Sequence, residues 1–107
     1  MNSLTFVGDE TLLKLAVASI GPIAIAVDAS LSSFQNYKTG VYDDPDCSST
    51  LNHGMLLTSY GTDSEFGDYW LIKNSFGISW GERGYMRLAR NKGNICGITD
   101  FAVFPIV

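Results

Sequence analysis

Hydrophobic positions near the start of the chain recur at helical spacing. From about residue 9 to residue 20 they are three or four positions apart, which predicts an amphipathic helix. The expected apolar face carries Leu12, Leu15, Ala16 and Ile20. Asp9 suits the N-cap position, and Gly21 followed by Pro22 ends the helix.

Short apolar stretches follow this helix. Residues 23–27 form a continuous apolar run between Pro22 and Asp28, which predicts a buried strand. Residues 30–37 suggest a short helix with Leu31 and Phe34 facing inward. A strand fragment at 40–42 and a polar loop at 43–50 complete this half of the chain.

The second half favours strands. Residues 53–60 and 69–74 predict a hairpin with a long tip at 61–68, and residues 84–89 and 101–106 predict two further strands. In the strand at 84–89, Met86 and Leu88 share one face. Short strands after one helix predict an α+β fold, an antiparallel sheet or partly open barrel with one packed N-terminal helix. A chain of 107 residues supports a single small domain.

Charge and hydropathy narrow the classes of partner. The formal net charge is −4 and the seven basic residues are scattered, so we expect no nucleic-acid partner. The longest apolar run has five residues where about 20 would span a bilayer, so we expect no membrane insertion. The first ten residues lack the basic start and apolar core of a signal peptide, which predicts retention where the chain is made if Met1 is the native start.

The candidate chemistry begins with the single histidine, His53. It starts one strand of the predicted hairpin, and Asn74 ends the other, so the two side chains could lie side by side. An amide that accepts a hydrogen bond from an imidazole N–H fixes the tautomer and orientation of the ring. A glycine-punctuated loop follows, and its Phe76 and Trp80 could cover that bond. The alternatives are an ordinary surface or core histidine and a turn asparagine.

The two cysteines, Cys47 and Cys96, permit one disulfide or two unrelated buried thiols. One histidine and two distant cysteines do not approach the ligand spacing of a zinc site. We therefore expect no metal and no cofactor.

Five segments in order resemble the papain-like cysteine peptidases, particularly the cathepsin L-like branch. They are residues 21–29 (GPIAIAVDA), 51–56 (LNHGML), 69–75 (YWLIKNS), 80–85 (WGERGY) and 96–98 (CGI). The resemblance covers nearly the whole chain from Asp9 onward. It implies that residues 9–107 are the C-terminal, histidine-bearing half of such a peptidase, and that residues 1–8 are a truncated lead-in.

The resemblance assigns roles to individual residues. His53 would be the base paired with a thiolate, Asn74 its orienting amide, and Phe76 and Trp80 the shielding aromatics, although the family usually has tryptophan at position 76. Cys47 and Cys96 match a pair that the family joins as a disulfide. Closing that loop contributes about 4 kcal/mol on the chain-entropy model. Such a disulfide implies a lysosomal or extracellular location.

The resemblance also maps a specificity pocket for the substrate onto Ala26, Leu51, Gly54 and Phe101. Phe101 at its floor would make the pocket shallow and apolar, which predicts a preference for medium aliphatic side chains. The alternative is that the apolar members of this set are simply core residues of a small barrel.

The nucleophilic cysteine has no counterpart here, because the family carries it in the other half together with the oxyanion-hole donors. We therefore predict part of a cysteine endopeptidase that is inactive alone. The alternatives are a non-catalytic binding or decoy homologue and a truncated gene product. Expected partners are a peptide or protein substrate, the missing half, and a propeptide or cystatin-like inhibitor. An exposed apolar patch with His53 and Trp80 would otherwise drive self-association.

Overall fold

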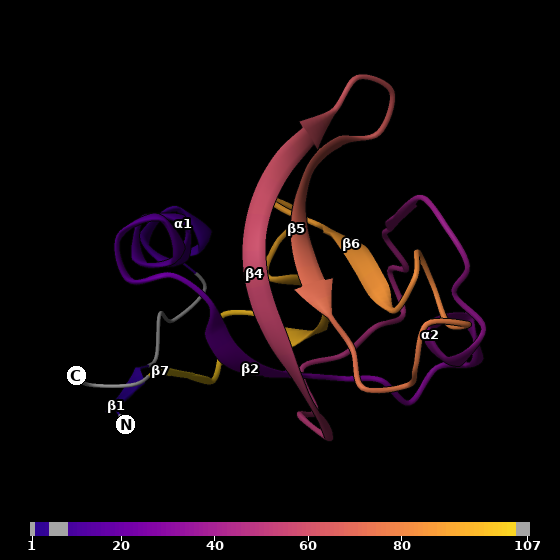
Figure 1. Ribbon diagram of the computed structural model, residues 1–107, viewed down its shortest axis with the longest axis horizontal. Helices are drawn as coiled ribbons and strands as arrows, with labels where there is room; N and C mark the ends of the chain where they lie inside the picture. The colour runs from indigo at the N-terminus through magenta and orange to yellow at the C-terminus, as the bar shows by residue number, and fades with distance from the viewer. Residues whose placement is uncertain (1, 5–8, 105–107) are drawn as a thin grey trace.

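The computed structural model describes residues 2–4 and 9–104, which form an open, mostly antiparallel sheet with one main helix (Figure 1). The elements are β1 (Asn2–Leu4), α1 (Glu10–Ile20), β2 (Ile23–Val27), α2 (Ser32–Gln35), β3 (Val41–Tyr42), β4 (His53–Asp63), β5 (Gly67–Lys73), β6 (Tyr85–Ala89) and β7 (Ala102–Phe104). The strand order is β1-β7-β2-β4-β5-β6-β3, and only β3 and β6 pair in parallel. The α+β prediction is confirmed.

Helix α1 begins at the predicted cap but buries a different face. The Asp9 carboxylate accepts a hydrogen bond from the Leu12 N–H at 3.0 Å, and the Gly21 N–H closes the last turn on the Val17 carbonyl. Leu13 and Val17 are buried, whereas Leu12, Leu15 and Ile20 are exposed, so the predicted apolar face was wrong. Ala16 alone of that set is partly buried against the core.

Glu10 explains this rotation of α1. Its Oε1 accepts hydrogen bonds from the Trp70 indole N–H and the Asn91 N–H, both at 3.0 Å, and its Oε2 accepts from the Asn94 N–H at 3.2 Å. Positions 10, 13 and 17 share one helix face, so turning Glu10 inward also turns Leu13 and Val17 inward. The sequence pattern assigned Glu10 no buried role.

The central hairpin is longer than predicted. β4 and β5 stay paired through Thr62–Asp68 and Asp63–Gly67, so only residues 64–66 form the tip. The Asp63 carboxylate accepts hydrogen bonds from the Glu65 and Phe66 N–H groups, which closes a tight turn in place of the long loop expected at 61–68.

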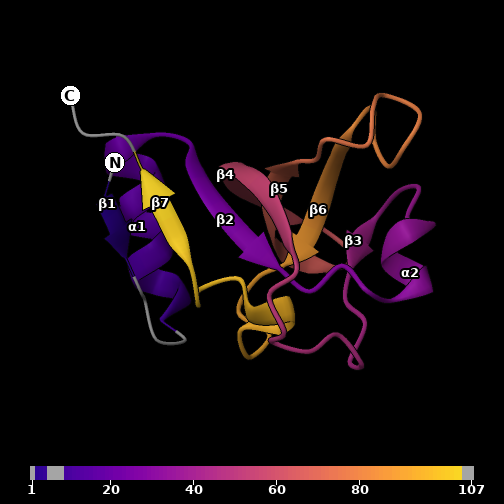
Figure 2. The same cartoon turned by 90° about the horizontal axis from the view of Figure 1, so that it is seen from below.

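The ends of the described chain pair with each other. β1, which the sequence pattern did not predict, lies beside β7 with Asn2 opposite Phe104 (Figure 2). The last strand spans 102–104 of the predicted 101–106, and residues 105 and 106 lie outside the described part of the chain.

The predicted helix at 30–37 shortens to α2 at 32–35, with Phe34 fully buried and Leu31 half-buried.

The core lies against one face of the curved sheet. Its largest fully buried side chains include Trp70, Phe34, Leu57, Ile72, Met86 and Leu88. Met86 and Leu88 face inward from β6 as predicted. Within the described residues, no helix is long and apolar enough to cross a bilayer.

Candidate active site

Antiparallel pairing of β4 and β5 brings the two candidate residues together. His53 is the first residue of β4 and Asn74 directly follows β5, so both lie at the same end of the hairpin. The His53 Nε2 lies 2.7 Å from the Asn74 Oδ1. Asn74 is buried, and its N–H donates to the Gly84 carbonyl at 2.9 Å, which fixes it against the turn before β6.

The hydrogen bonds around Asn74 define the proton position on the imidazole. The Asn74 Oδ1 also accepts from the Ser75 N–H at 2.7 Å, which identifies this atom as the amide oxygen. An oxygen can only accept, so Nε2 carries the proton and Nδ1 has the free lone pair. Within the described part of the chain, Nδ1 has no hydrogen-bond partner. The ring can therefore take up a proton at Nδ1.

Aromatic rings surround the imidazole. The Phe76 ring lies over it, with centroids 4.9 Å apart and planes at 32°. Phe76 in turn contacts Trp80 edge-on at 5.5 Å, and Phe34 approaches His53 edge-on at 6.4 Å. Phe76 is 39% exposed, so it covers the bond from the solvent side.

We predicted that Trp80 lies in an exposed apolar patch, but the structure shows that it does not. It is buried, and its indole N–H donates to the Phe34 carbonyl at 3.1 Å. It lies in contact with Phe34, Tyr37 and Phe76 and supports the Phe76 ring from below. A buried indole N–H needs a hydrogen-bond acceptor, and the Phe34 carbonyl provides one inside the domain.

The loop that carries Phe76 depends on glycine at one close approach. Gly81 has φ of +61°, and a Cβ built on it would lie 2.5 Å from the Tyr85 carbonyl oxygen. The Gly81 N–H donates to the Tyr37 carbonyl at 3.1 Å. Any side chain at position 81 would displace the turn that leads from Trp80 into β6.

Three of the four predicted pocket residues line one open hollow of about 590 Å³, here called the apolar hollow. Ala26 of β2 and Gly54 of β4 are paired in register and form part of its wall, and Phe101 adds its ring, which is 41% exposed. The remaining lining residues are Ala24, Ile25, Met55, Leu56, Lys73, Asn74 and Ser75. Leu51 does not line it, because its Cδ2 lies against Gly97.

Asn74 connects the hollow with the histidine. It lines the apolar hollow while its oxygen contacts His53. Its Nδ2 is buried and has no hydrogen-bond partner among the described residues. A buried donor of this kind normally has a partner, so Nδ2 is an unsatisfied donor within this site.

Cys47 and Cys96 form a disulfide that closes a separation of 49 residues. No cysteine is free among the residues that the structure describes, which span every cysteine of the sequence. Neither sulfur can therefore act as a thiolate nucleophile in this chain. The described residues also contain no group of three or more metal-ligating side chains.

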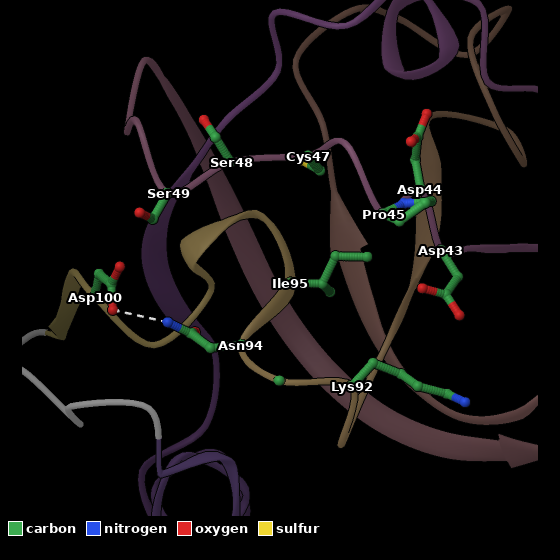
Figure 3. A pocket seen from close by; sticks show the side chains of 11 residues that line it. Asp43, Asp44, Pro45, Cys47, Ser48, Ser49, Lys92, Asn94, Ile95 and Asp100 are labelled. Atoms are coloured by element: carbon green, nitrogen blue, oxygen red, sulfur yellow. Dashed lines mark hydrogen bonds between the residues drawn. The ribbon is translucent and has the colours of Figure 1, made fainter.

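A second cavity of about 640 Å³ lies beside the disulfide (Figure 3). Its lining includes Asp43, Asp44, Asp100 and Lys92, but neither His53 nor Asn74. In the view of Figure 3, Asn94 points toward Asp100, to which it donates a hydrogen bond of 2.9 Å. The cavity is polar and separate from the candidate active site.

The sequence pattern missed one buried carboxylate near the site, Asp28. It directly follows β2, whose last residue Val27 is paired with His53. An aspartate that comes immediately after a buried strand, next to the strand of a candidate base, is the signal that could have revealed it.

The family model described as papain family cysteine protease matches residues 2–106. A cathepsin L-like protein of Caenorhabditis elegans is 59% identical over 101 residues, which cover 94% of this chain and 30% of the relative. Cathepsin S of Mus musculus is 53% identical over 98 residues, which cover 92% of this chain and 28% of the relative. The chain thus spans less than a third of these relatives.

Solved structures give the same result. The digestive procathepsin L 3 of Tenebrio molitor larval midgut superposes with a TM-score of 0.88 at 44% identity, covering 96% of this chain and 34% of that one. The bromelain protease of Ananas comosus, in complex with the E64 inhibitor, superposes with a TM-score of 0.88 at 39% identity, covering 98% and 49%.

Proposed function

Because the chain belongs to the papain family of cysteine proteases, we propose that it supplies the histidine and asparagine of a Cys-His-Asn peptidase site. His53 is the general base and Asn74 holds it in the productive tautomer. The nucleophilic cysteine comes from outside these 107 residues, since Cys47 and Cys96 are joined to each other. The observation that carries the proposal is the 2.7 Å contact between His53 Nε2 and Asn74 Oδ1 beneath Phe76.

In this proposal the imidazole takes up and returns one proton in each half of the reaction. Nδ1 takes the proton of the thiol, the thiolate attacks the peptide carbonyl carbon, and a C–S bond forms. The C–N bond then breaks as the imidazolium returns its proton to the leaving amine, which leaves an acyl-enzyme. In the second half, Nδ1 takes a proton from water, hydroxide displaces the sulfur, and the thiol is restored together with the carboxylic acid product.

The surface that surrounds the apolar hollow is where the cysteine-bearing half would dock. Leu56 and Phe101 line the hollow and are 37% and 41% exposed, so they give this surface apolar area that a partner can bury. Without that half the chain also lacks oxyanion-hole donors, so it is inactive alone.

The same hollow supports a substrate pocket. Ala26, Gly54 and Phe101 provide small and apolar walls, which suit a medium aliphatic side chain of a peptide or protein substrate. Leu51 packs on Gly97 and lies outside the lining of the hollow. A propeptide or a cystatin-like inhibitor would bind over the same surface.

The Cys47–Cys96 disulfide supports a site of action outside the reducing cytosol. We propose a lysosomal or extracellular setting, in keeping with the resemblance of the chain to cathepsins.

The test is reconstitution. The 107-residue chain is refolded with the cysteine-bearing half of the Caenorhabditis elegans relative, and hydrolysis of fluorogenic peptides is followed. We expect activity from the pair and none from either half. His53→Ala should lower kcat/KM by roughly a thousandfold or more, and Asn74→Ala by roughly a hundredfold, because they remove the base and its orienting acceptor. Lys92→Ala, in the separate polar cavity, should leave the rate unchanged.

A pair that assembles and binds peptide but does not cleave it would contradict the proposal and indicate a binding homologue. The phenylalanine at position 76 is the feature that favours this second function, since it covers the histidine without an indole N–H. A chain that neither pairs nor binds peptide would indicate a truncated product.

A further inference from the structure

The Asp28 carboxylate is almost completely buried, at 3% exposure, and accepts five hydrogen bonds. Its Oδ1 accepts from the Ser30 N–H and hydroxyl and from the Asn52 side-chain amide, at 3.1, 2.6 and 2.8 Å. Its Oδ2 accepts from the Ser48 N–H and hydroxyl, at 3.0 and 2.9 Å. Among the ion pairs of the described residues, none involves Asp28, so these donors alone compensate its buried charge.

These bonds join three segments that are distant in sequence. They connect the end of β2, the loop that holds the disulfide, and the residue that precedes His53. Asn52 is held at further points, because its N–H donates to the Val27 carbonyl at 3.0 Å and its Oδ1 accepts from the Ala29 N–H at 2.9 Å. Asn52 is thus fixed through both backbone and side chain, immediately before β4 begins.

The position of the imidazole depends on this anchor. His53 is the first residue of β4 and pairs with Val27, so its backbone has no strand residue before it to hold its place. The bond from Nε2 to Asn74 Oδ1 is 2.7 Å, and a displacement of about 1 Å would take it beyond hydrogen-bond distance. A fixed Asn52 restricts that displacement.

We propose that Asp28 is a positioning residue for the catalytic base, acting through Asn52 to hold the start of β4 so that the imidazole stays bonded to Asn74. This inference rests on the proposed function of His53. Asp28 itself touches no reacting atom. A purely structural role, bracing the disulfide loop through Ser48, predicts a less stable domain whose His53–Asn74 bond is unchanged.

The test uses the proton on His53 Nε2. His53 is the only histidine of the chain, so a long-range ¹H–¹⁵N spectrum of the labelled protein contains one imidazole pattern. In the unmodified chain the Nε2 proton should be observable and slow to exchange with water. The buried indole proton of Trp70, bonded to Glu10 of α1, reports general loosening of the domain.

Two variants are compared with a matched control. Asp28→Ala removes both carboxylate oxygens and with them the bond from Asn52, and Asn52→Ala removes the link to β4 while leaving the bonds of Asp28 to Ser30 and Ser48. In both variants the Nε2 proton of His53 should exchange with water at least tenfold faster than in the unmodified chain. The exchange rate of the Trp70 indole proton should not change to match. Ser30→Ala removes a bond to the same carboxylate oxygen outside the path to His53, and should leave the exchange rate near that of the unmodified chain.

Unchanged exchange in Asn52→Ala, or acceleration that follows Trp70 in parallel, would overturn the proposal. If Asp28→Ala does not fold, Asn52→Ala decides the matter, because it leaves the carboxylate bonded to Ser30 and Ser48. Absence of a protected Nε2 proton in the unmodified chain would instead remove the basis of the proposed function, so the two failures are distinguishable.

Discussion

Two buried carboxylates show how hydrogen-bond donors take the place of a cation inside the domain. Glu10 and Asp28 are 7% and 3% exposed, and each is surrounded by N–H or O–H donors and not by a cation. The Ser30 hydroxyl, with further donors from Asn52 and Ser48, holds the pKa of Asp28 well below its usual range, although burial opposes this shift. Hydrogen bonding therefore outweighs desolvation at this residue.

This pKa shift predicts loss of stability in acid. A carboxyl whose pKa is lowered by folding stabilises the native state above its unfolded pKa of about 3.9, and the contribution is lost as pH falls through that value toward the folded pKa. Asp28→Asn should cost roughly 2 kcal/mol near neutral pH, because donors of Ser48 lose their acceptor. The difference in free energy of unfolding between the unmodified chain and Asp28→Asn should become smaller as pH falls from about 5 to below 3.

Urea unfolding at several pH values measures this gap. Asp46→Asn, on an exposed side chain of the adjoining loop, is the matched control and should behave like the unmodified chain throughout. A gap that stays constant with pH would mean that Asp28 does not change its protonation state on unfolding in this range.

Residue types and order were enough to pair His53 with Asn74, because a hairpin brings the start of one strand to the end of the next. They were not enough to find the Asp28 network. Its donors Ser48 and Asn52 lie 20 and 24 positions away, and their approach depends on the loop closed by the disulfide. No local pattern records contacts of that kind.

At the scale of elements, spacing predicted the type of structure better than its orientation. α1 formed where expected, but its apolar residues nearly encircle it, and the buried bond from Glu10 to Trp70 selected the inner face. The hairpin exceeded its predicted strands because Asp63 caps a tight turn that the polar stretch at 61–68 concealed. In both elements, long-range or turn hydrogen bonds overrode the hydrophobic pattern.

The loop between β5 and β6 gives a prediction at this scale. Gly77 and Gly81 both have positive φ, but a Cβ at position 77 would meet nothing within 4 Å, whereas one at 81 would meet the Tyr85 carbonyl at 2.5 Å. Gly77→Ala should cost about 1 kcal/mol from backbone strain alone. Gly81→Ala should cost roughly 2 kcal/mol more, because a backbone oxygen cannot move aside.

Thermal and urea unfolding of the two variants provide the comparison. The Nε2 proton of His53 should also exchange faster in Gly81→Ala, since Trp80 and Phe76 lose their support. Equal stabilities for the two variants would show that the turn relaxes without cost.

At the scale of the whole molecule, the domain has a packed core and an open apolar surface beside His53 and Asn74. The fold class followed from the succession of one helix and several short strands. The edge strand β1 did not, since three residues carry too little pattern to predict a strand and its pairing partner lies about 100 positions away. The exposed side chains of the apolar hollow include Leu56 and Phe101.

This surface predicts self-association of the isolated chain. We expect sedimentation velocity at micromolar concentrations to show species larger than the 11.6 kDa monomer, which the cysteine-bearing half should disperse into a defined pair. Replacing Leu56 and Phe101 by serine should shift the isolated chain toward monomer. Leu15→Ser, on the exposed face of α1, removes a similar apolar area outside the hollow and should have little effect. A monodisperse monomer with a sharp melting transition would contradict this prediction.

The disulfide between Cys47 and Cys96 encloses β4, β5 and β6, with His53 and Asn74 on opposite sides of the hairpin tip. A single proteolytic nick at residues 64–66 would therefore cut the chain between the two members of the dyad without releasing either piece. The nicked protein would gain only the mass of one water and would separate into two fragments only under reducing conditions. Cleavage at this exposed tip would therefore leave both members of the site in one covalently closed molecule.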